Sequence, residues 1–164
     1  MDLCTDRAIP VGAYVAEKMG IDHPYSYETS LIVTNKNKMK AWLKSIGVPT
    51  SDFRMVLSME DIQDEGLRYP LVVKPSDASG SIDITKVGNS QELKDAVKKA
   101  LSLSRNQQAI VEEFVQGPEI QIDCFVADGE VVVVDIKEKR KYTGDILTLS
   151  YGSLIPARIS DEMK

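Results

Sequence analysis

One short stretch of the sequence combines a lysine with a small, polar segment that could bind an anion. Residues 72–87 read VVKPSDASGSIDITKV, so Lys74 stands just before several Ser, Asp, Ala and Gly residues, after which an alternating pattern resumes. Small residues let backbone N–H groups approach a ligand, and a concave row of N–H groups attracts anions. Ser76, Ser79 and Ser81 would add hydroxyl donors, and Lys74 an ammonium group.

The same stretch also fits a plain hairpin loop beside a solvated lysine, and its residues alone do not choose between the two interpretations. It matches neither G-x-x-x-x-G-K-[ST] nor G-x-G-x-x-G, so neither of these nucleotide-binding fingerprints applies. The choice therefore depends on the rest of the chain.

Composition narrows the class of protein. The chain has 164 residues, which suits one domain or two small lobes that share a core. A net charge of −5 without a long basic run gives little support to nucleic-acid binding. The longest apolar run, Val131–Val134, is far too short to span a bilayer, and no apolar segment of a secretory signal follows Met1. We therefore expect a cytoplasmic protein without a membrane segment.

Few residues are suited to metal binding or to covalent catalysis. Cys4 and Cys124 lie far apart in no metal-ligand spacing, and His23 is the single histidine. A zinc site or a Ser/His/Asp triad is therefore not expected. Asp123 and Asp135 lie on expected strands without the spacing of a metal pair. We assign no catalytic residue and no metal ligand.

The elements that must position these residues follow from periodicity and from capping signals. Apolar residues at helical spacing predict helices at 10–19 and 36–46, and Asn89 with Glu92 caps a third helix. Ser58 with Asp61 predicts a further short helix. Trp42 and its helical neighbours, as well as Cys124, are expected in the core.

Strands are expected at Phe53–Leu57, Pro70–Lys74, Ser81–Val87, Gln108–Val115, Glu119–Val126, Glu130–Lys137 and Ile146–Leu149. Asp128 and Gly129 form a two-residue hairpin signal between two of these strands. Short hairpin connections favour antiparallel pairing, so the sequence predicts an α+β fold and not a doubly wound parallel sheet.

Three blocks, NKNKMKAWLKSIGVPTSDF, YPLVVKPSDASGSIDITKV and QAIVEEFVQGPEIQIDCFV, resemble the ATP-grasp superfamily in their order and context. They are most similar to the branch with biotin carboxylase and the carbamoyl phosphate synthetase large subunit, and they cover residues from about 10 to about 137. The resemblance implies the ATP-grasp small (lid) lobe, of mostly antiparallel sheet with helices, plus the start of the large lobe. The expected parts are 1–35, the tail of a preceding domain; 36–115, the small lobe with its lead-in helix; and 116–164, a truncated large lobe.

The resemblance also implies an ATP site. By their positions in the three blocks, the residues that match the family's ATP-binding positions are Lys36, Lys74, Ser76, Ser79, Gly80, Ser81, Glu112, Glu113, Phe114, Val115 and Glu119. Lysines and the loop would contact phosphates, the residues from Glu112 to Val115 would read adenine through backbone groups, and Glu119 would accept from the ribose hydroxyls. Many family members carry more glycine in the loop, where this chain has Gly80 alone.

Some of these residues also fit simpler roles. Lys36 fits an exposed lysine at a helix start, and Glu119 fits a solvent-facing glutamate. The basic stretch Lys137–Lys141 fits a solvated turn, and the sequence does not indicate which of its residues would meet phosphate.

The family resemblance implies the ATP-binding portion of a ligase that joins a carboxylate to an amine, a thiol or bicarbonate through an acyl phosphate. Its partners would be ATP and a small carboxylate, and the full-length protein could form a homodimer.

Mg²⁺ would be required, with ligands after Lys164, so this chain alone is expected to be inactive. The alternatives are a non-catalytic module for regulatory nucleotide binding or protein contacts, and a purely structural domain. The carboxylate and the acceptor are not readable from the residues.

Overall fold

The computed structural model describes residues 5–78, 83–142 and 150–160 of the chain. These residues form two compact units, Met1–Phe114 and Val115–Lys164. Every strand pairing among the described residues is antiparallel. The α+β fold with antiparallel sheets is therefore confirmed, whereas the functional meaning of the expected domain boundaries stays a prediction.

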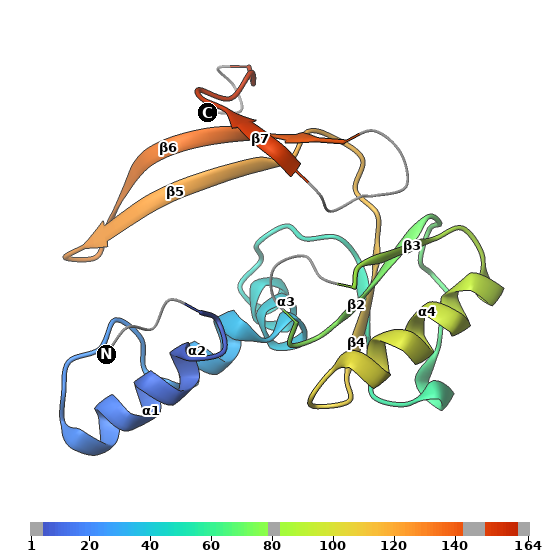
Figure 1. Cartoon of the computed structure of the whole chain (residues 1–164), viewed down its shortest axis with the longest axis horizontal. Helices are drawn as coiled ribbons and strands as arrows, with labels where there is room; N and C mark the ends of the chain where they lie inside the picture. The colour runs from blue at the N-terminus through green and yellow to red at the C-terminus, as the bar shows by residue number, and fades with distance from the viewer. Residues whose placement is uncertain (1–4, 79–82, 143–149, 161–164) are drawn as a thin grey trace. The chain divides into compact units, whose positions relative to one another are not determined.

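The first unit contains three N-terminal helices and a four-stranded sheet with a fourth helix packed on it (Figure 1). Its elements are α1 (Ile9–Met19), α2 (Tyr27–Thr34), α3 (Lys36–Ser45), β1 (Phe53–Val56), the 3-10 helix η1 (Met59–Asp61), β2 (Leu71–Pro75), β3 (Thr85–Val87), α4 (Ser90–Leu103) and β4 (Ala109–Glu113). The sheet order is β1-β4-β2-β3, so the last strand in the sequence is inserted between the first two.

The core of the first unit lies between α4 and one face of this sheet. Asn89 begins α4 as predicted, because its side chain accepts a hydrogen bond from the backbone N–H of Glu92. The apolar face of α4 then packs on β2 and β3. The buried cluster comprises Val56, Leu67, Leu71, Val73, Val87, Leu93, Ala96, Val97, Ala100, Ala109 and Val111. One face of the sheet is thus committed to apolar packing.

The second unit is a three-stranded sheet in the order β5-β6-β7. Its strands are β5 (Ile120–Ala127), β6 (Glu130–Lys141) and β7 (Ser150–Leu154). The predicted two-residue hairpin between β5 and β6 is confirmed, because Asp128 and Gly129 both have positive φ, at 51° and 80°. The predicted strand Ile146–Leu149 lies outside the described residues.

Helix α2 was not predicted from the sequence. Its eight residues, YETSLIVT, contain several β-branched side chains, which have low helix propensity. The helix begins at a cap that is visible in the structure, where the Thr29 N–H donates to Ser26 Oγ over 3.0 Å. A short helix of this kind depends on packing against its neighbours more than on its own sequence.

The prediction of a capping box at Ser58 was wrong. The Ser58 side chain makes no cap hydrogen bond, and the turn that follows is the 3-10 helix η1. Asp61 Oδ2 accepts instead from the N–H of Leu57, the residue before the cap, over 3.1 Å.

Two residues expected in the core are exposed. Trp42 exposes 47% of its surface, because the buried side of α3 is polar and contains Asn37 and Lys40. Cys124 is exposed on β5. Apolar neighbours on the same sheet, such as Phe125 and Val132, are exposed as well. Alternation alone therefore identified a strand correctly but misjudged its burial.

The packing of α4 predicts which residue of this helix contributes most to stability. Leu93 is fully buried against the sheet, so Leu93→Ala should lower the free energy of unfolding by about 2–5 kcal/mol. Lys98→Ala, on the exposed side of α4, should change it by less than about 0.5 kcal/mol. Urea unfolding of both variants measures the difference, and equal effects would contradict the packing described here.

Candidate functional site

The face of the sheet opposite α4 carries a lysine and a glutamate that form an ion pair. Side chains alternate along a strand, so Lys74 of β2 and Glu112 of β4 both lie on the face opposite Val73 and Val111. The register pairs Lys74 with Ile110 and Val72 with Glu112, which places the two charged residues diagonally across neighbouring strands. Lys74 Nζ makes an ion pair with Glu112 Oε1.

A second lysine reaches the same carboxylate from α3. Lys40 Nζ lies 2.5 Å from Glu112 Oε2 and donates to Ser51 Oγ over 2.5 Å. Ser51 Oγ is itself 3.1 Å from Glu112 Oε2. Both Lys40 and Glu112 are buried. Sequence reasoning missed Lys40, although its position four residues after Lys36 on one helix indicates a shared face.

Burial by itself disfavours the charged form of the Glu112 carboxyl group. The ammonium groups of Lys74 and Lys40 outweigh this effect, so the pKa of Glu112 lies below its ordinary value. A carboxylate in this setting is ionised at neutral pH and links three elements of the first unit, α3, β2 and β4.

Lys36 begins α3 and lies next to the segment that follows β2. Its backbone N–H donates to the Ser76 carbonyl over 2.9 Å, and its ammonium donates to the Ala78 carbonyl. Partial burial, followed by the nearby Lys74 ammonium, lowers the pKa of Lys36. The structure therefore brings together the two lysines that the sequence had selected.

This region concentrates positive charge in a chain whose net charge is −5. Lys40 and Lys74 are paired with the Glu112 carboxylate, and Asp77 and Asp6 lie close enough to Lys36 to favour its charged form. Asp77 is in turn paired with Arg105, with 3.2 Å between Nε and Oδ2. The four cations exceed these three carboxylates, so the region attracts anions.

Of the serines that were predicted to bind phosphate, the structure describes Ser76. Ser76 is fully buried, and its Oγ donates to Asn106 Oδ1 over 2.9 Å. Its N–H donates to the Gln108 carbonyl over 3.0 Å. Ser79, Gly80 and Ser81 lie outside the described residues. Ser76 therefore makes contacts inside the lobe that tie down the start of the segment.

Glu113 and Phe114, which were predicted to contact adenine, also have partners inside the first unit. Their N–H groups donate to the carbonyls of Asp52 and Pro70, each over 3.0 Å. The Glu113 carboxylate binds the Arg68 guanidinium, with 2.9 Å between Oε2 and Nη2. The Phe114 ring lies 4.1 Å from Lys86 Nζ. These two N–H groups are therefore already used within the lobe.

The remaining predicted residues belong to the second unit. Val115 is exposed, and the Glu119 carboxylate forms an ion pair with Lys141.

Within the basic stretch, Lys137 Nζ lies 2.6 Å from Asp123 Oδ2 and 3.5 Å from Asp135 Oδ2, and Arg140 contacts Glu138 over 3.1 Å. These contacts do not indicate which residue of Lys137–Lys141 would meet phosphate.

Asp77 and Arg105 line part of a cavity of about 260 Å³. Its other charged lining residues are Asp6, Arg7 and Lys38. Lys36, Lys74 and Glu112 are not among its described lining residues, so this cavity is distinct from the lysine pair.

In the part of the chain that the structure describes, no group of three or more His, Cys, Asp or Glu side chains could hold a metal ion. No helix in that part of the chain is both long and apolar enough to cross a bilayer.

Comparison with known proteins gives a consistent family. The family described as D-ala D-ala ligase C-terminus matches residues 42–150, which is more than half of the chain. The L-arginine-specific L-amino acid ligase of Bacillus subtilis is 33% identical over 149 residues, covering 87% of this chain and 35% of that protein. The carbamoyl phosphate synthase large chain of Thermoanaerobacter sp. is 32% identical over 142 residues, covering 81% of this chain and 12% of that protein.

The fold leads to the same group of proteins. The crystal structure of the L-amino acid ligase from Bacillus licheniformis superposes with a TM-score of 0.81 at 29% sequence identity, covering 99% of this chain and 37% of that one. The chain thus spans about a third or less of the length of these relatives. The resemblance to ATP-grasp ligases noted in the sequence is confirmed, and the chain belongs to the D-ala D-ala ligase C-terminus family, whose relatives here are ATP-grasp ligases.

Proposed function

We propose that the chain is the ATP-binding portion of an ATP-grasp ligase that joins a carboxylate to an amine. The observation that carries this proposal is the cluster of ammonium groups formed by Lys40 and Lys74, which are paired with the buried Glu112 carboxylate, and by Lys36 close to Lys74. A polyphosphate matches such a site because Lys36 and Lys74 each carry a positive charge and an ammonium group with several N–H donors. Membership of a ligase family supports ATP as the source of that polyphosphate.

In the proposed reaction, a carboxylate oxygen of the substrate attacks the γ-phosphorus of ATP, and ADP leaves. The amine then attacks the carbonyl carbon of the acyl phosphate, so that an amide forms and inorganic phosphate is released. The chain's share would be to hold the phosphates and offset their charge during transfer. Two relatives described as L-amino acid ligases favour an amino acid as the carboxylate substrate.

The lysines divide into two roles in this proposal. Lys40 is buried and bound to Glu112 and Ser51, so it acts within the lobe. Lys36 and Lys74 are less buried and would contact phosphate. Mg²⁺ is expected of an ATP-grasp ligase, but the described residues offer no cluster of ligands for it, and we assign no step to it.

Binding of nucleotides tests this division. Lys36→Met and Lys74→Met should each weaken ATP binding about 10- to 100-fold, because each removes a charge-assisted contact worth about 1.5–3 kcal/mol. Adenosine binding should stay unchanged. Equilibrium binding with labelled ATP, ADP and adenosine measures both effects.

Lys98→Met is the matched control, because Lys98 is exposed on α4. If the unaltered chain binds adenosine as tightly as ATP, the phosphate site is refuted. If it binds no nucleotide, a non-catalytic module for protein contacts becomes the better interpretation.

The buried carboxylate also predicts a pH dependence of stability. The pKa of Glu112 is lower in the folded protein than in the unfolded chain. Its contribution to stability is therefore complete above the unfolded pKa of about 4.3 and is lost as the pH falls through the folded pKa. Glu112→Gln should cost about 3 kcal/mol at pH 7, where Lys40 loses its buried partner, and should cost less at pH 3.

Urea unfolding of both proteins between pH 3 and pH 7 measures this dependence. Glu130→Gln, at an exposed position of β6, serves as the control. A constant difference between Glu112→Gln and the unaltered chain over this pH range would show that the ionised carboxylate is not the stabilising group.

A further inference from the structure

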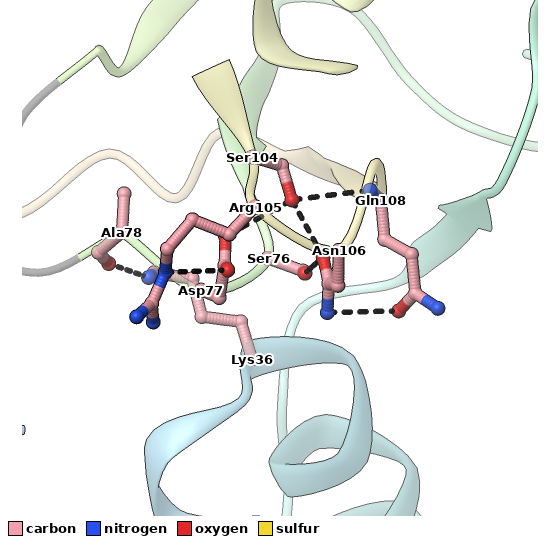
Figure 2. Close-up of polar contacts among 8 residues, drawn as sticks. All are labelled: Lys36, Ser76, Asp77, Ala78, Ser104, Arg105, Asn106 and Gln108. Carbon is pink, nitrogen blue, oxygen red and sulfur yellow. Dashed lines mark hydrogen bonds and ion pairs between the residues drawn. The ribbon is translucent and has the colours of Figure 1, made fainter. Parts of the chain in front are cut away.

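The segment that follows β2 is tied to the turn between α4 and β4 by polar side chains (Figure 2). Ser104 Oγ lies 2.9 Å from Asp77 Oδ1 and 2.5 Å from Asn106 Oδ1. Asn106 Oδ1 also accepts from Ser76 Oγ over 2.9 Å. Together with Arg105, which is paired with Asp77, we call these five residues the polar anchor.

The turn that supplies three of the five anchor residues is itself fixed by hydrogen bonds to the backbone on either side of it. The Ser104 N–H donates to the Ala100 carbonyl over 3.0 Å at the end of α4. Ser104 Oγ accepts from the Gln108 N–H over 3.1 Å at the start of the next segment. Ser104 is buried and Ser76 is fully buried, so these hydrogen bonds are shielded from water.

The other side of the anchor leads to Lys36. The Ser76 carbonyl accepts from the Lys36 backbone N–H, and the Ala78 carbonyl accepts from the Lys36 ammonium. Figure 2 shows Lys36 pointing from α3 toward the segment that contains Asp77 and Ala78. The positions of residues 76–78 therefore determine where the ammonium of Lys36 is held.

We infer that the polar anchor is a positioning device for Lys36, in which Ser104 and Asn106 act on an anionic ligand without touching it. The link to phosphate rests on the proposed function, whereas the link to Lys36 rests on the contacts alone. No pattern in the sequence indicates a role for Ser104 or Asn106, because both lie about thirty residues after the segment that they hold.

The first measurement concerns Lys36 and needs no nucleotide. Ser104→Ala removes the central hydroxyl, and Asn106→Ala removes the shared acceptor while leaving every charge in place. Both should raise the acetylation rate of Lys36 about fivefold relative to Lys98, which is exposed on α4; fivefold is the factor expected for the loss of one ordinary hydrogen bond. Limited acetic anhydride labelling with mass spectrometry measures this ratio.

Ser102→Ala is the matched control. Ser102 is an exposed serine of α4 whose hydroxyl donates only within its own helix, to the Lys99 carbonyl over 2.7 Å. Its substitution should leave the Lys36 labelling unchanged. Thermal melts establish that each variant is folded, and Asn106→Ala, at an exposed position, keeps the test decisive if Ser104→Ala does not fold.

The second measurement compares ATP with adenosine. The anchor variants should weaken ATP binding about fivefold and leave adenosine binding as it is. An equal loss for both ligands would indicate general loosening and overturn the inference, as would unchanged Lys36 labelling in a folded variant. If the unaltered chain shows no preference for ATP, the proposed function fails, and the labelling ratio still decides whether the anchor positions Lys36.

Discussion

The ion pairs of Glu112 are the interaction on which the first unit depends. A buried carboxylate is costly unless it is fully paired, and its partners here come from two different elements, Lys40 from α3 and Lys74 from β2. The need to satisfy this charge therefore attaches α3 to the sheet face that α4 leaves uncovered. Because Lys36 precedes Lys40 by one helical turn, the same attachment places its ammonium next to Lys74.

This arrangement explains why a chain of net negative charge has a basic site at this point. The two faces of the sheet meet different demands: α4 covers one with Leu93, Val97 and their neighbours, while the other carries the charged residues. Lys40 and Lys74 around the Glu112 carboxylate, with Lys36 close by, leave a surplus of positive charge on this face. The apolar face provides the rigid support that such a site needs in order to hold a ligand in a defined position.

The second unit follows a different pattern. Apolar side chains of β5 and β6, among them Ile122, Phe125 and Val132, are exposed, and ion pairs such as Lys141–Glu119 and Lys137–Asp123 link its charged residues. The alternation of hydrophobic residues therefore predicts that these segments are strands. It does not predict whether their side chains are buried, because that depends on what packs on each face of the sheet. For the same reason Trp42 lies at helical spacing on α3 and is nevertheless exposed.

Local signals in the sequence determined most of the elements. The Asn89 cap, the Asp128–Gly129 turn and the helical spacing after Lys36 each depend on neighbouring residues only, and the structure contains all three. The family resemblance indicated Lys36 and Lys74 before any coordinates. The tertiary structure alone decided the surroundings of these lysines. Lys40 and Ser51 contact Glu112 because strand register and helix packing bring together residues that are distant in sequence. Ser76 is held by Asn106, which also contacts Ser104, for the same reason. Contacts of this kind depend on the closure of the whole lobe, so no pattern within a short stretch of sequence encodes them.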